Sequence, residues 1–412
     1  MTPIARIIQL RDPLICGDGR PFAAGLRGRT GGWPHPSLLA GTARTQLILP
    51  DEFDAQGRIS HEINQRLLQV RLAGPVPAWR NGDQTWQPAF PAPADALPAR
   101  PEKKSESVEY HPLRPCKTLP AGAGMDSISP ELRLYPLLAQ NPPAGKPPAQ
   151  LPRFWKLSAF RQWLETSAGQ SRAWAPSDCL MEPLAGSRTH VSVNFESQTA
   201  EEGLLFSTES LDFGPIIAAG DAEEQPGQSE RPELALFCRL SLPPGLDAQR
   251  LRGAIPMGGE GRLTLWEDSP DLLSDFQPSK DLLAQIRSAR RLRLSLLTPA
   301  WFQHGWLAEW MKAGQWSWPG GSRLPMRLIA AAVPRPVPIS GWDLFLHQPK
   351  PTRWLAPAGA VYFFELPEGA SEEQLRQLWL AAVSDEMPKE RSFRQDGFGL
   401  AVFGAWDYTS AM

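Results

Sequence analysis

The chain has 412 residues, a formal net charge of −2 at pH 7 and 42% hydrophobic residues. This composition excludes wholesale disorder, and the length accommodates two domains of ordinary size. A free-standing nucleic-acid binder carries a basic excess, because phosphate contacts need lysine and arginine. The charge balance therefore argues against an autonomous RNA-binding protein. Any RNA contact must come from a local patch or be shared with other subunits.

The four cysteines show no CxxC pair, so their spacing predicts neither a zinc site nor a disulfide framework. We therefore expect free thiols, no metal and no cofactor. The sequence shows no signal-peptide pattern and no apolar run of about 18 residues. From this we expect a cytoplasmic protein.

The N-terminal half begins with a predicted strand at residues 3–10, which are rich in isoleucine. A helix is predicted to start at Pro36, with Ser37 as the candidate cap. Residues 66–73 and 84–90 indicate two further strands.

The composition changes between residues 88 and 152, which hold 15 of the 44 prolines. Proline lacks an amide donor and fixes φ, so this stretch is not expected to form a helix or a central strand. It is either an inserted arm or a partly disordered linker. An apolar helical pattern resumes at residues 153–164, which favours the inserted arm.

Alternation at residues 190–195 and 203–208 predicts a β-hairpin, and residues 234–242 predict the first strand of a new unit. In the C-terminal part, residues 360–364 and 400–403 read as strands. Between them Ser371 and Gln374 have the spacing of a capping box.

The helix after Ser371 is predicted to bury a face built from Leu375, Leu378, Trp379 and Ala382, and to stop at Pro388. Strand, helix and strand in about 45 residues make half of a ferredoxin-like βαββαβ unit. Strands at 327–333 and 261–266 are expected to complete that sheet. The predicted fold is α+β with two ferredoxin-like units, at 1–213 (with the Pro-rich insertion 88–152) and 214–412.

Two segments have the chemistry of RNA contacts. Gly258, Gly259 and Gly261 precede Arg262, and glycine amides beside a guanidinium suit a phosphate. A tight turn that needs positive φ explains these glycines equally well. Lys350 and Arg353 lie on a proline-containing loop beside two tryptophans, a combination that holds nucleic-acid backbone and stacks bases. The alternative is a buried Trp342 and a solvated charge pair.

Two further segments have simpler explanations. The glycine-rich segment 396–404 introduces a strand, and its packing against a neighbouring helix explains it as well as a binding loop does. Four arginines at 287, 290, 291 and 293 are typical of a solvated helix face, and an RNA or acidic-protein contact is the alternative.

Catalytic residues are sparse. The six histidines lack metal-binding spacings, and no GxSxG motif is present. A metal-independent ribonuclease needs a paired general base and acid. His35 and His190 are the candidates, but nothing in the sequence pairs them, and a lone histidine is more often structural. We expect a non-catalytic protein.

Several segments together resemble the Cmr-type RAMP subunit of type III-B CRISPR effector complexes, in order and spacing over nearly the whole chain. They are PLICGDGRPF (13–22), PSLLAGTAR (36–44), TAEEGLLFST (199–208), GGEGR (258–262), LTP (297–299), GWD (341–343), PKPTR (349–353), PAGAVYFFE (357–365) and GFGLAVFG (397–404).

The resemblance implies two ferredoxin-like RAMP domains and a structural role in antiviral defence. Such a subunit clasps the 5′ tag of the guide RNA (crRNA), docks on the large polymerase-like subunit and abuts a backbone RAMP subunit, so that it meets target RNA only indirectly. Segment 17–22 and the helix start at Pro36 resemble the family's tag-binding region. The RNA-binding residues implied here are Arg20, His35, Arg44, Gly258, Gly259, Gly261, Arg262, Lys350 and Arg353.

Two alternatives remain open at this point. One is a RAMP endoribonuclease that processes precursor crRNA, with His35 in its active site. The other is the equivalent subunit of a related type III complex.

Overall fold

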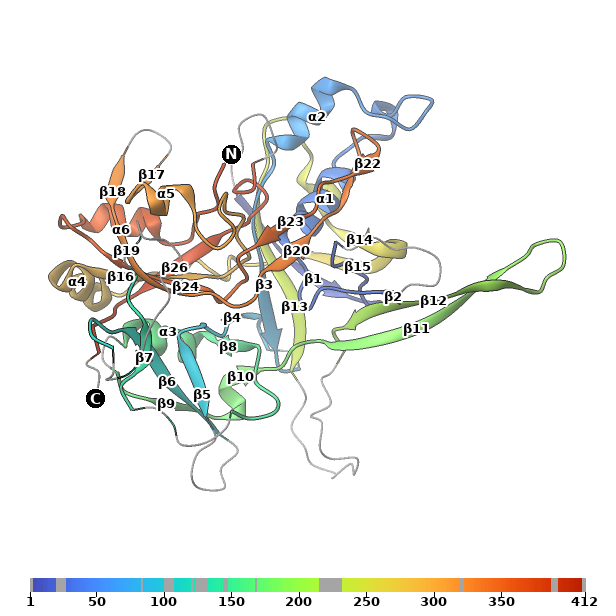
Figure 1. Cartoon of the computed structure of the whole chain (residues 1–412). Helices are drawn as coiled ribbons and strands as arrows, with labels where there is room; N and C mark the ends of the chain where they lie inside the picture. Colours follow the sequence, from blue (N-terminus) through green and yellow to red (C-terminus); the bar gives the residue numbers. More distant parts are fainter. Residues whose placement is uncertain are drawn as a thin grey trace.

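The computed structural model describes residues 3–19, 27–82, 84–99, 107–119, 122, 132, 134–141, 143, 147–166, 169–214, 232–318, 322–386 and 392–409. Arg20, one of the predicted RNA contacts, lies outside the described residues. Within the described part, the chain is a strand-rich mixed α/β protein with several antiparallel sheets (Figure 1).

The helices are α1 (Pro36–Gln46), α2 (His61–Leu68), α3 (Leu157–Glu165), α4 (Lys280–Ala289), α5 (Glu309–Lys312) and α6 (Glu372–Leu378). The 3₁₀ turns are η1 (Pro50–Glu52), η2 (Pro176–Asp178), η3 (Ala248–Leu251) and η4 (Gly259–Gly261).

The strands of the N-terminal half are β1 (Pro3–Leu10), β2 (Arg27–Gly28), β3 (Arg71–Arg80), β4 (Gln87–Pro91), β5 (Ala96–Ala99), β6 (Val108–Pro115), β7 (Leu137–Ala139), β8 (Phe154–Lys156), β9 (Arg172–Trp174), β10 (Cys179–Leu180), β11 (Leu184–Val193) and β12 (Ala200–Asp212). The remaining strands are β13 (Glu233–Ser241), β14 (Gly253–Met257), β15 (Arg262–Asp268), β16 (Arg291–Leu296), β17 (Gln315–Ser317), β18 (Arg323–Pro325), β19 (Arg327–Ala332), β20 (Val337–Ile339), β21 (Trp342–Asp343), β22 (Gln348–Pro349), β23 (Arg353–Leu355), β24 (Val361–Glu365), β25 (Ala381–Ala382) and β26 (Leu400–Gly404).

The larger sheet has the order β10-β8-β4-β3-β13-β1-β15-β14. At its centre β1 pairs antiparallel with both β13 and β15, and β13 pairs antiparallel with β3. Counted in chain order as first to fourth, strands β1, β3, β13 and β15 therefore lie side by side in the order 4-1-3-2. Helix α1 connects the first of these strands to the second.

The second sheet has the order β19-β24-β16-β26-β25. Strands β16, β19, β24 and β26 also lie in the order 4-1-3-2, and their pairings are antiparallel. Helix α6 begins as predicted, because Ser371 Oγ accepts from the amide of Gln374 and the Gln374 side chain accepts from the amide of Ser371.

Several local predictions are wrong in detail. Strand β15 belongs to the first sheet and not to the C-terminal one, because its edges pair with β1 and β14. Residues 233–268 thus join the N-terminal strands, although they lie within 214–412. The division of the chain into two folding domains stays a prediction. Helix α6 ends at Leu378, so Ala382 lies in β25 and Pro388 lies outside the described residues.

Two boundaries in the N-terminal half also differ. Residues 66–68 end helix α2, and the following strand starts at Arg71. Helix α1 is capped at His35, so Ser37 lies inside the helix; Pro36 takes the first turn, where its missing amide costs no hydrogen bond.

The Pro-rich stretch forms strands, which the proline content argued against. Strand β6 pairs with β5 on one edge and with β7 and β9 on the other. The amide of Leu113 donates to the backbone carbonyl of Asp95, and the amide of Cys116 donates to the backbone carbonyl of Pro136. Backbone amides alternate between the two edges of a strand. An amide at Pro112 would therefore face the second edge, between the segments that pair with β9 and β7. Pro112 is therefore tolerated because, among the described residues, none pairs with it on that edge.

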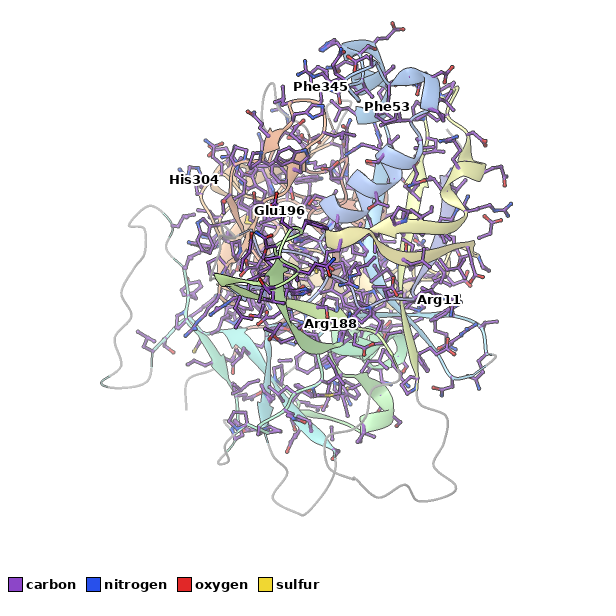
Figure 2. The ribbon with its side chains drawn as sticks, turned by 90° about the vertical axis from the view of Figure 1, so that its right-hand side faces the viewer. Arg11, Phe53, Arg188, Glu196, His304 and Phe345 are labelled. Atoms are coloured by element: carbon purple, nitrogen blue, oxygen red, sulfur yellow. The ribbon has the colours of Figure 1, made fainter. Side chains whose placement is uncertain are left out.

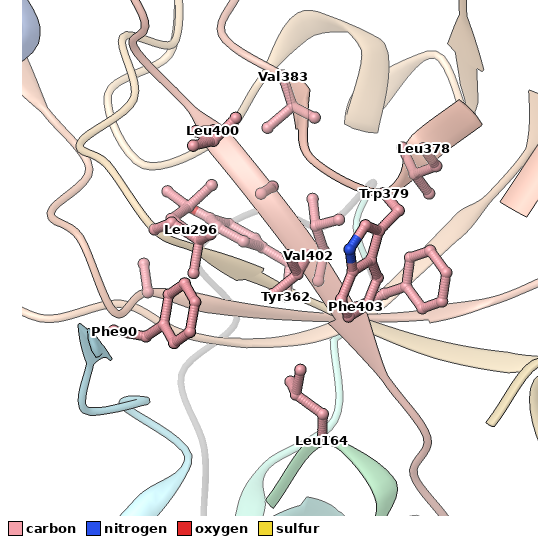
Figure 3. Close-up of a cluster of buried hydrophobic side chains, with 14 of the residues drawn as sticks. Phe90, Leu164, Leu296, Tyr362, Leu378, Trp379, Val383, Leu400, Val402 and Phe403 are labelled. Carbon is pink, nitrogen blue, oxygen red and sulfur yellow. The ribbon is translucent and has the colours of Figure 1, made fainter. Parts of the chain in front are cut away.

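A shared core joins the two sheets. Phe90 of β4 and Leu164 of α3 lie in the same buried cluster as Leu296 and Tyr362 of the second sheet (Figure 3). Within it a buried carboxylate of Asp95 accepts from both Arg114 and Arg293 at 2.8 Å, and from Trp163 at 2.9 Å. The Pro-rich segment is therefore bound to the C-terminal sheet by charge as well as by apolar packing.

Candidate nucleic-acid interface

Residues 14–19, named here the central loop, belong to a segment that the sequence singled out. Two other such segments contact this loop. The amide of Gly259 donates to the carbonyl of Ile15 at 2.8 Å. From the other side, Thr352 Oγ1 donates to the carbonyl of Gly19 at 3.3 Å. The glycine-rich turn 258–262 and the loop 349–353 therefore flank the same short segment, although they come from different sheets.

The glycine-rich turn is shaped by close packing. Gly258 has φ +75°, and a Cβ there would lie 2.5 Å from the Ile15 carbonyl oxygen. The Gly259 amide is used by that carbonyl, so it does not point at a ligand. Arg262 pairs with Glu260 at 2.5 Å and is 17% exposed. The tight-turn explanation accounts for the glycines, and Arg262 contributes a partly neutralised charge at the edge.

Loop 349–353 belongs to a β-hairpin that spans β20 to β23. Its inner face packs through Ile339 and Leu355, which are 5% and 1% exposed. Trp354 stands opposite Pro338 on the other face and is 57% exposed. Trp342 is 58% exposed, which contradicts the alternative that it is buried.

The backbone of Lys350 is held within this hairpin by two hydrogen bonds. The Lys350 amide donates to Gly341 at 2.7 Å, and its carbonyl accepts from Ser340 Oγ at 2.8 Å. Lys350 and Arg353 are both half-buried. Two cations and two exposed indoles thus lie on one short hairpin, which is the combination that grips single-stranded nucleic acid.

Arg44 is removed from the candidate contacts. Its guanidinium donates to the carbonyls of Leu67 at 3.0 Å and Val70 at 2.9 Å and pairs with Asp396 at 2.7 Å. The side chains of Arg44 and Asp396 are only 8% and 5% exposed. Arg44 therefore clamps α1 to the loop before β26 and does not face solvent.

The glycine-rich segment 396–404, which begins at Asp396, is also explained by packing. Gly397 has φ +95°, and a Cβ there would lie 2.7 Å from the carbonyl oxygen of Gly74 in β3. The segment packs against the first sheet and α1, so the structure supports the packing explanation.

His35 caps α1 without a side-chain hydrogen bond to the helix. Burial lowers the pKa of His35 to about 4, so the ring is neutral at pH 7. A neutral imidazole can donate one hydrogen bond to RNA, but it does not balance a phosphate charge.

The arginine cluster divides into three environments. Arg293 is fully buried on Asp95, and Arg291 pairs with Asp407 at 2.6 Å. Arg287 and Arg290 line an open hollow of about 530 Å³ between α4 and the start of α6. They lie on a different part of the fold from the central loop.

Sequence reasoning missed two exposed basic residues, one bonded to the central loop and one that precedes it in the chain. Arg29 is exposed, and its carbonyl accepts from the amide of Asp18 at 3.2 Å. Arg11 is exposed beside β15, where its amide donates to Leu263 (Figure 2). For Arg29 a local signal existed, since it stands in the glycine-rich run GLRGRTGG. For Arg11 no local signal existed, because its position beside β15 results from the long-range pairing of β1 with β15.

The cysteines are free and buried, as expected: Cys16, Cys116, Cys179 and Cys238. Burial raises the pKa of Cys179 and Cys238 to about 12, so neither is a thiolate at neutral pH. Among the described residues, no group of three or more metal-ligating side chains comes together. No described helix is long and apolar enough to cross a membrane.

The fold and these loops define a strand-rich α/β protein with a loop-built candidate surface for nucleic acid. The family model described as CRISPR-associated protein (Cas_Cmr3) matches residues 6–406. The chain therefore belongs to the Cas_Cmr3 family, which confirms the resemblance to Cmr-type subunits.

Solved structures show a looser similarity. A chain of the type III-B Cmr-beta complex bound to cognate target RNA and AMPPnP (state 1) is 12% identical, with a TM-score of 0.45; the alignment covers 87% of this chain and 86% of that one. A chain of Cmr-beta bound to cognate target RNA is 12% identical with a TM-score of 0.43 and the same coverage. No curated protein matches the chain.

Proposed function

We propose that this chain is a crRNA-binding subunit of a type III-B CRISPR effector complex. In this role it grips the 5′ tag of the guide RNA and docks on the large polymerase-like subunit and on an adjacent backbone subunit. Membership of the Cas_Cmr3 family over residues 6–406 carries the proposal. The near-balanced formal charge of −2 fits a subunit that binds RNA through a local surface and meets protein elsewhere.

The proposed RNA surface is the central loop with its two flanking segments. Lys350 and Arg353 supply phosphate contacts, and Trp342 and Trp354 supply stacking faces. Arg29 adds a cation on the third side. Arg262 takes part at the rim, where Glu260 reduces its charge. His35 at the N-cap of α1 and Arg44 within the helix support this region and make no ionic contact with RNA.

The fold proposed with this function is two ferredoxin-like RAMP units. The 4-1-3-2 order of antiparallel strands in both sheets supports it. In the first unit, the short turn η3 and strand β14 stand where the second helix of the motif is expected. The insertion between β3 and β13 carries the Pro-rich strands and the β11–β12 ribbon.

We further propose that the subunit is non-catalytic. His35 lies at the start of α1, whereas His190 lies on β11 and shares a 2.8 Å hydrogen bond with Thr208. These candidates sit on different elements, and each has a structural environment that accounts for it. General acid–base cleavage of RNA needs two such groups around one 2′-hydroxyl and its leaving oxygen.

Co-expression with the other subunits of the complex tests the proposal. The chain is expected to co-purify with guide RNA only when the large subunit is present, because its own charge gives little RNA affinity. The matched control is expression of the chain alone with the same guide RNA. Recovery of a stable monomer that ignores both partner and RNA would contradict the proposal.

A further inference from the structure

The tip of the β20–β23 hairpin, defined as residues 342–349, reaches the side of the first sheet that carries α1 and α2 (Figure 1). Its two strands share only two paired positions, Trp342 with Pro349 and Asp343 with Gln348. A two-stranded ribbon of this length is at most marginally stable in water. The tip therefore needs support from the body of the protein.

Hydrogen bonds shape the tip but do not tie it to the body. Asp343 Oδ1 accepts from the amides of Phe345 at 3.0 Å and Leu346 at 2.9 Å, and these bonds order the turn. Within the described part of the chain, no hydrogen bond joins residues 342–349 to either large sheet or to α2. The position of the tip therefore depends on side-chain packing.

Side chains at the turn divide between the body and solvent. Leu344 and Phe345 are half-buried and pack against the core of the first sheet. The Phe345 ring also meets the ring of His61, the first residue of α2, with centroids 6.0 Å apart and planes at 61°. Leu346, next in sequence, is 57% exposed. Figure 2 labels Phe345 at the end of the molecule that α2 occupies. Phe345 is thus the aromatic side chain through which the tip rests on α2.

A second fixed point lies at the neck of the hairpin. Gly19 of the central loop has φ +78°, and a Cβ there would lie 2.8 Å from the amide nitrogen of Ser340. Trp342 follows this neck, and Lys350 lies on the return strand after Phe345. The side chains proposed to hold RNA therefore lie between two contacts with the N-terminal half. A hairpin held at neck and tip keeps them in one position before RNA arrives.

We propose that Phe345 is a positioning residue for guide-RNA binding, with α2 as its support. Packed on α2, Phe345 holds the hairpin where its tryptophans and cations face one RNA strand, and it does not touch RNA itself. Without this anchor the tip samples other positions. Only molecules in the competent position bind, so the apparent affinity falls by the fraction that they represent. The inference rests on the proposed function and gives α2 a part in it.

Titration of the reconstituted complex with fluorescent guide RNA tests the role of Phe345. Phe345→Ala is expected to weaken binding about tenfold, with an unchanged salt slope because no phosphate contact is removed. Leu346→Ala, at the adjacent exposed position, is the matched control and should bind like the wild type. Phe345→Leu keeps the apolar packing without a stacking face and should restore most of the affinity.

Three results of this titration would overturn the proposal. They are unchanged affinity of Phe345→Ala, an equal loss in Leu346→Ala, and a Phe345→Leu variant as weak as Phe345→Ala. The last result would mean that the aromatic ring stacks on RNA directly.

Hydrogen exchange separates positioning from loss of structure. In the RNA-free complex of Phe345→Ala, the amides of residues 341–353 are expected to exchange faster than in the wild type, whereas those of β1 and β13 keep their protection. Faster exchange throughout β1 and β13 would assign Phe345 to stability alone. Unchanged exchange in the hairpin would show that Phe345 does not anchor it. Either result would contradict the positioning role.

A double-mutant cycle tests α2 as the support. His61→Ala is expected to weaken RNA binding less than Phe345→Ala, and the double variant should bind no more weakly than Phe345→Ala, because both substitutions remove the same contact. Fully additive losses would show that the two rings act separately and would remove α2 from the proposal.

The positioning role and the proposed function fail differently. If the wild-type complex does not bind guide RNA, the proposed function is wrong. If the wild type binds and Phe345→Ala binds equally well, only the positioning role is wrong.

Discussion

Thr352 and Gly19 are 333 positions apart in sequence, yet the Thr352 hydroxyl donates to the Gly19 carbonyl at 3.3 Å. This contact joins a hairpin of the C-terminal half to a loop of the N-terminal half. The proposed RNA surface is therefore composite, and neither half of the chain can form it alone.

Charge reversal on the hairpin should weaken RNA binding. Lys350→Glu with Arg353→Glu is expected to reduce guide-RNA retention in the complex and to lower its salt dependence, because each lost phosphate contact reduces the slope by about one unit. Salt titration of RNA binding measures this. The matched control, Arg287→Glu with Arg290→Glu at the distant hollow, should leave the slope unchanged. An unchanged slope in the hairpin variant would assign that loop to a protein contact.

The two exposed tryptophans should contribute through stacking. Trp342→Ala and Trp354→Ala are each expected to weaken RNA binding by about 1–3 kcal/mol. Neither should change stability much, since both side chains are more than half exposed. Binding of fluorescent single-stranded RNA to the complex provides the measurement, and duplex RNA of the same length is the comparison. Equal losses for single-stranded and duplex RNA would contradict stacking.

Arg44 should be a stability residue. Arg44→Ala leaves Asp396 buried without its cation and frees two carbonyl groups, so a loss of about 3–5 kcal/mol in unfolding free energy is expected. Denaturant unfolding measures it. Arg376→Ala removes an exposed pair with Glu372 and should cost about 0.5 kcal/mol or less. Normal stability of Arg44→Ala with reduced RNA binding would restore Arg44 as an RNA contact.

His35 should make stability depend on pH. Its pKa is about 4 in the folded chain, below the unfolded value of about 6.5. The unfolded state therefore takes up the proton first, and stability is complete above about pH 6.5 and decreases as the pH falls toward 4. Roughly 1–3 kcal/mol should be lost, because the side chain is only partly shielded from solvent. Unfolding of His35→Gln should lack this loss, whereas the exposed-residue control His61→Gln should retain it.

The absence of catalysis is a separate prediction. Purified protein incubated with CRISPR repeat RNA is expected to leave the RNA intact, with and without the His35→Ala substitution. Gel electrophoresis of labelled RNA checks this. Cleavage by the wild type that His35→Ala abolishes would replace the structural role with that of a processing endoribonuclease.

The sequence determined the features that depend on neighbouring residues. Strand β1, the hairpin at β11 and β12 and the capping box at Ser371 follow from alternation and local hydrogen bonding, and all three are present. The gathering of cations and tryptophans between residues 342 and 354 was also readable, because a short hairpin keeps sequence neighbours together.

Only the tertiary structure decided which strands share a sheet and which charges are buried. Strand β15 looked like part of the C-terminal unit, but its partner β1 lies about 250 residues earlier, and pairing over such a distance leaves no local pattern. Arg44 looked like an RNA contact until Asp396 was found beside it. An arginine reads the same in sequence whether it meets a phosphate or a buried carboxylate, because its partner is chosen by the packing of distant segments.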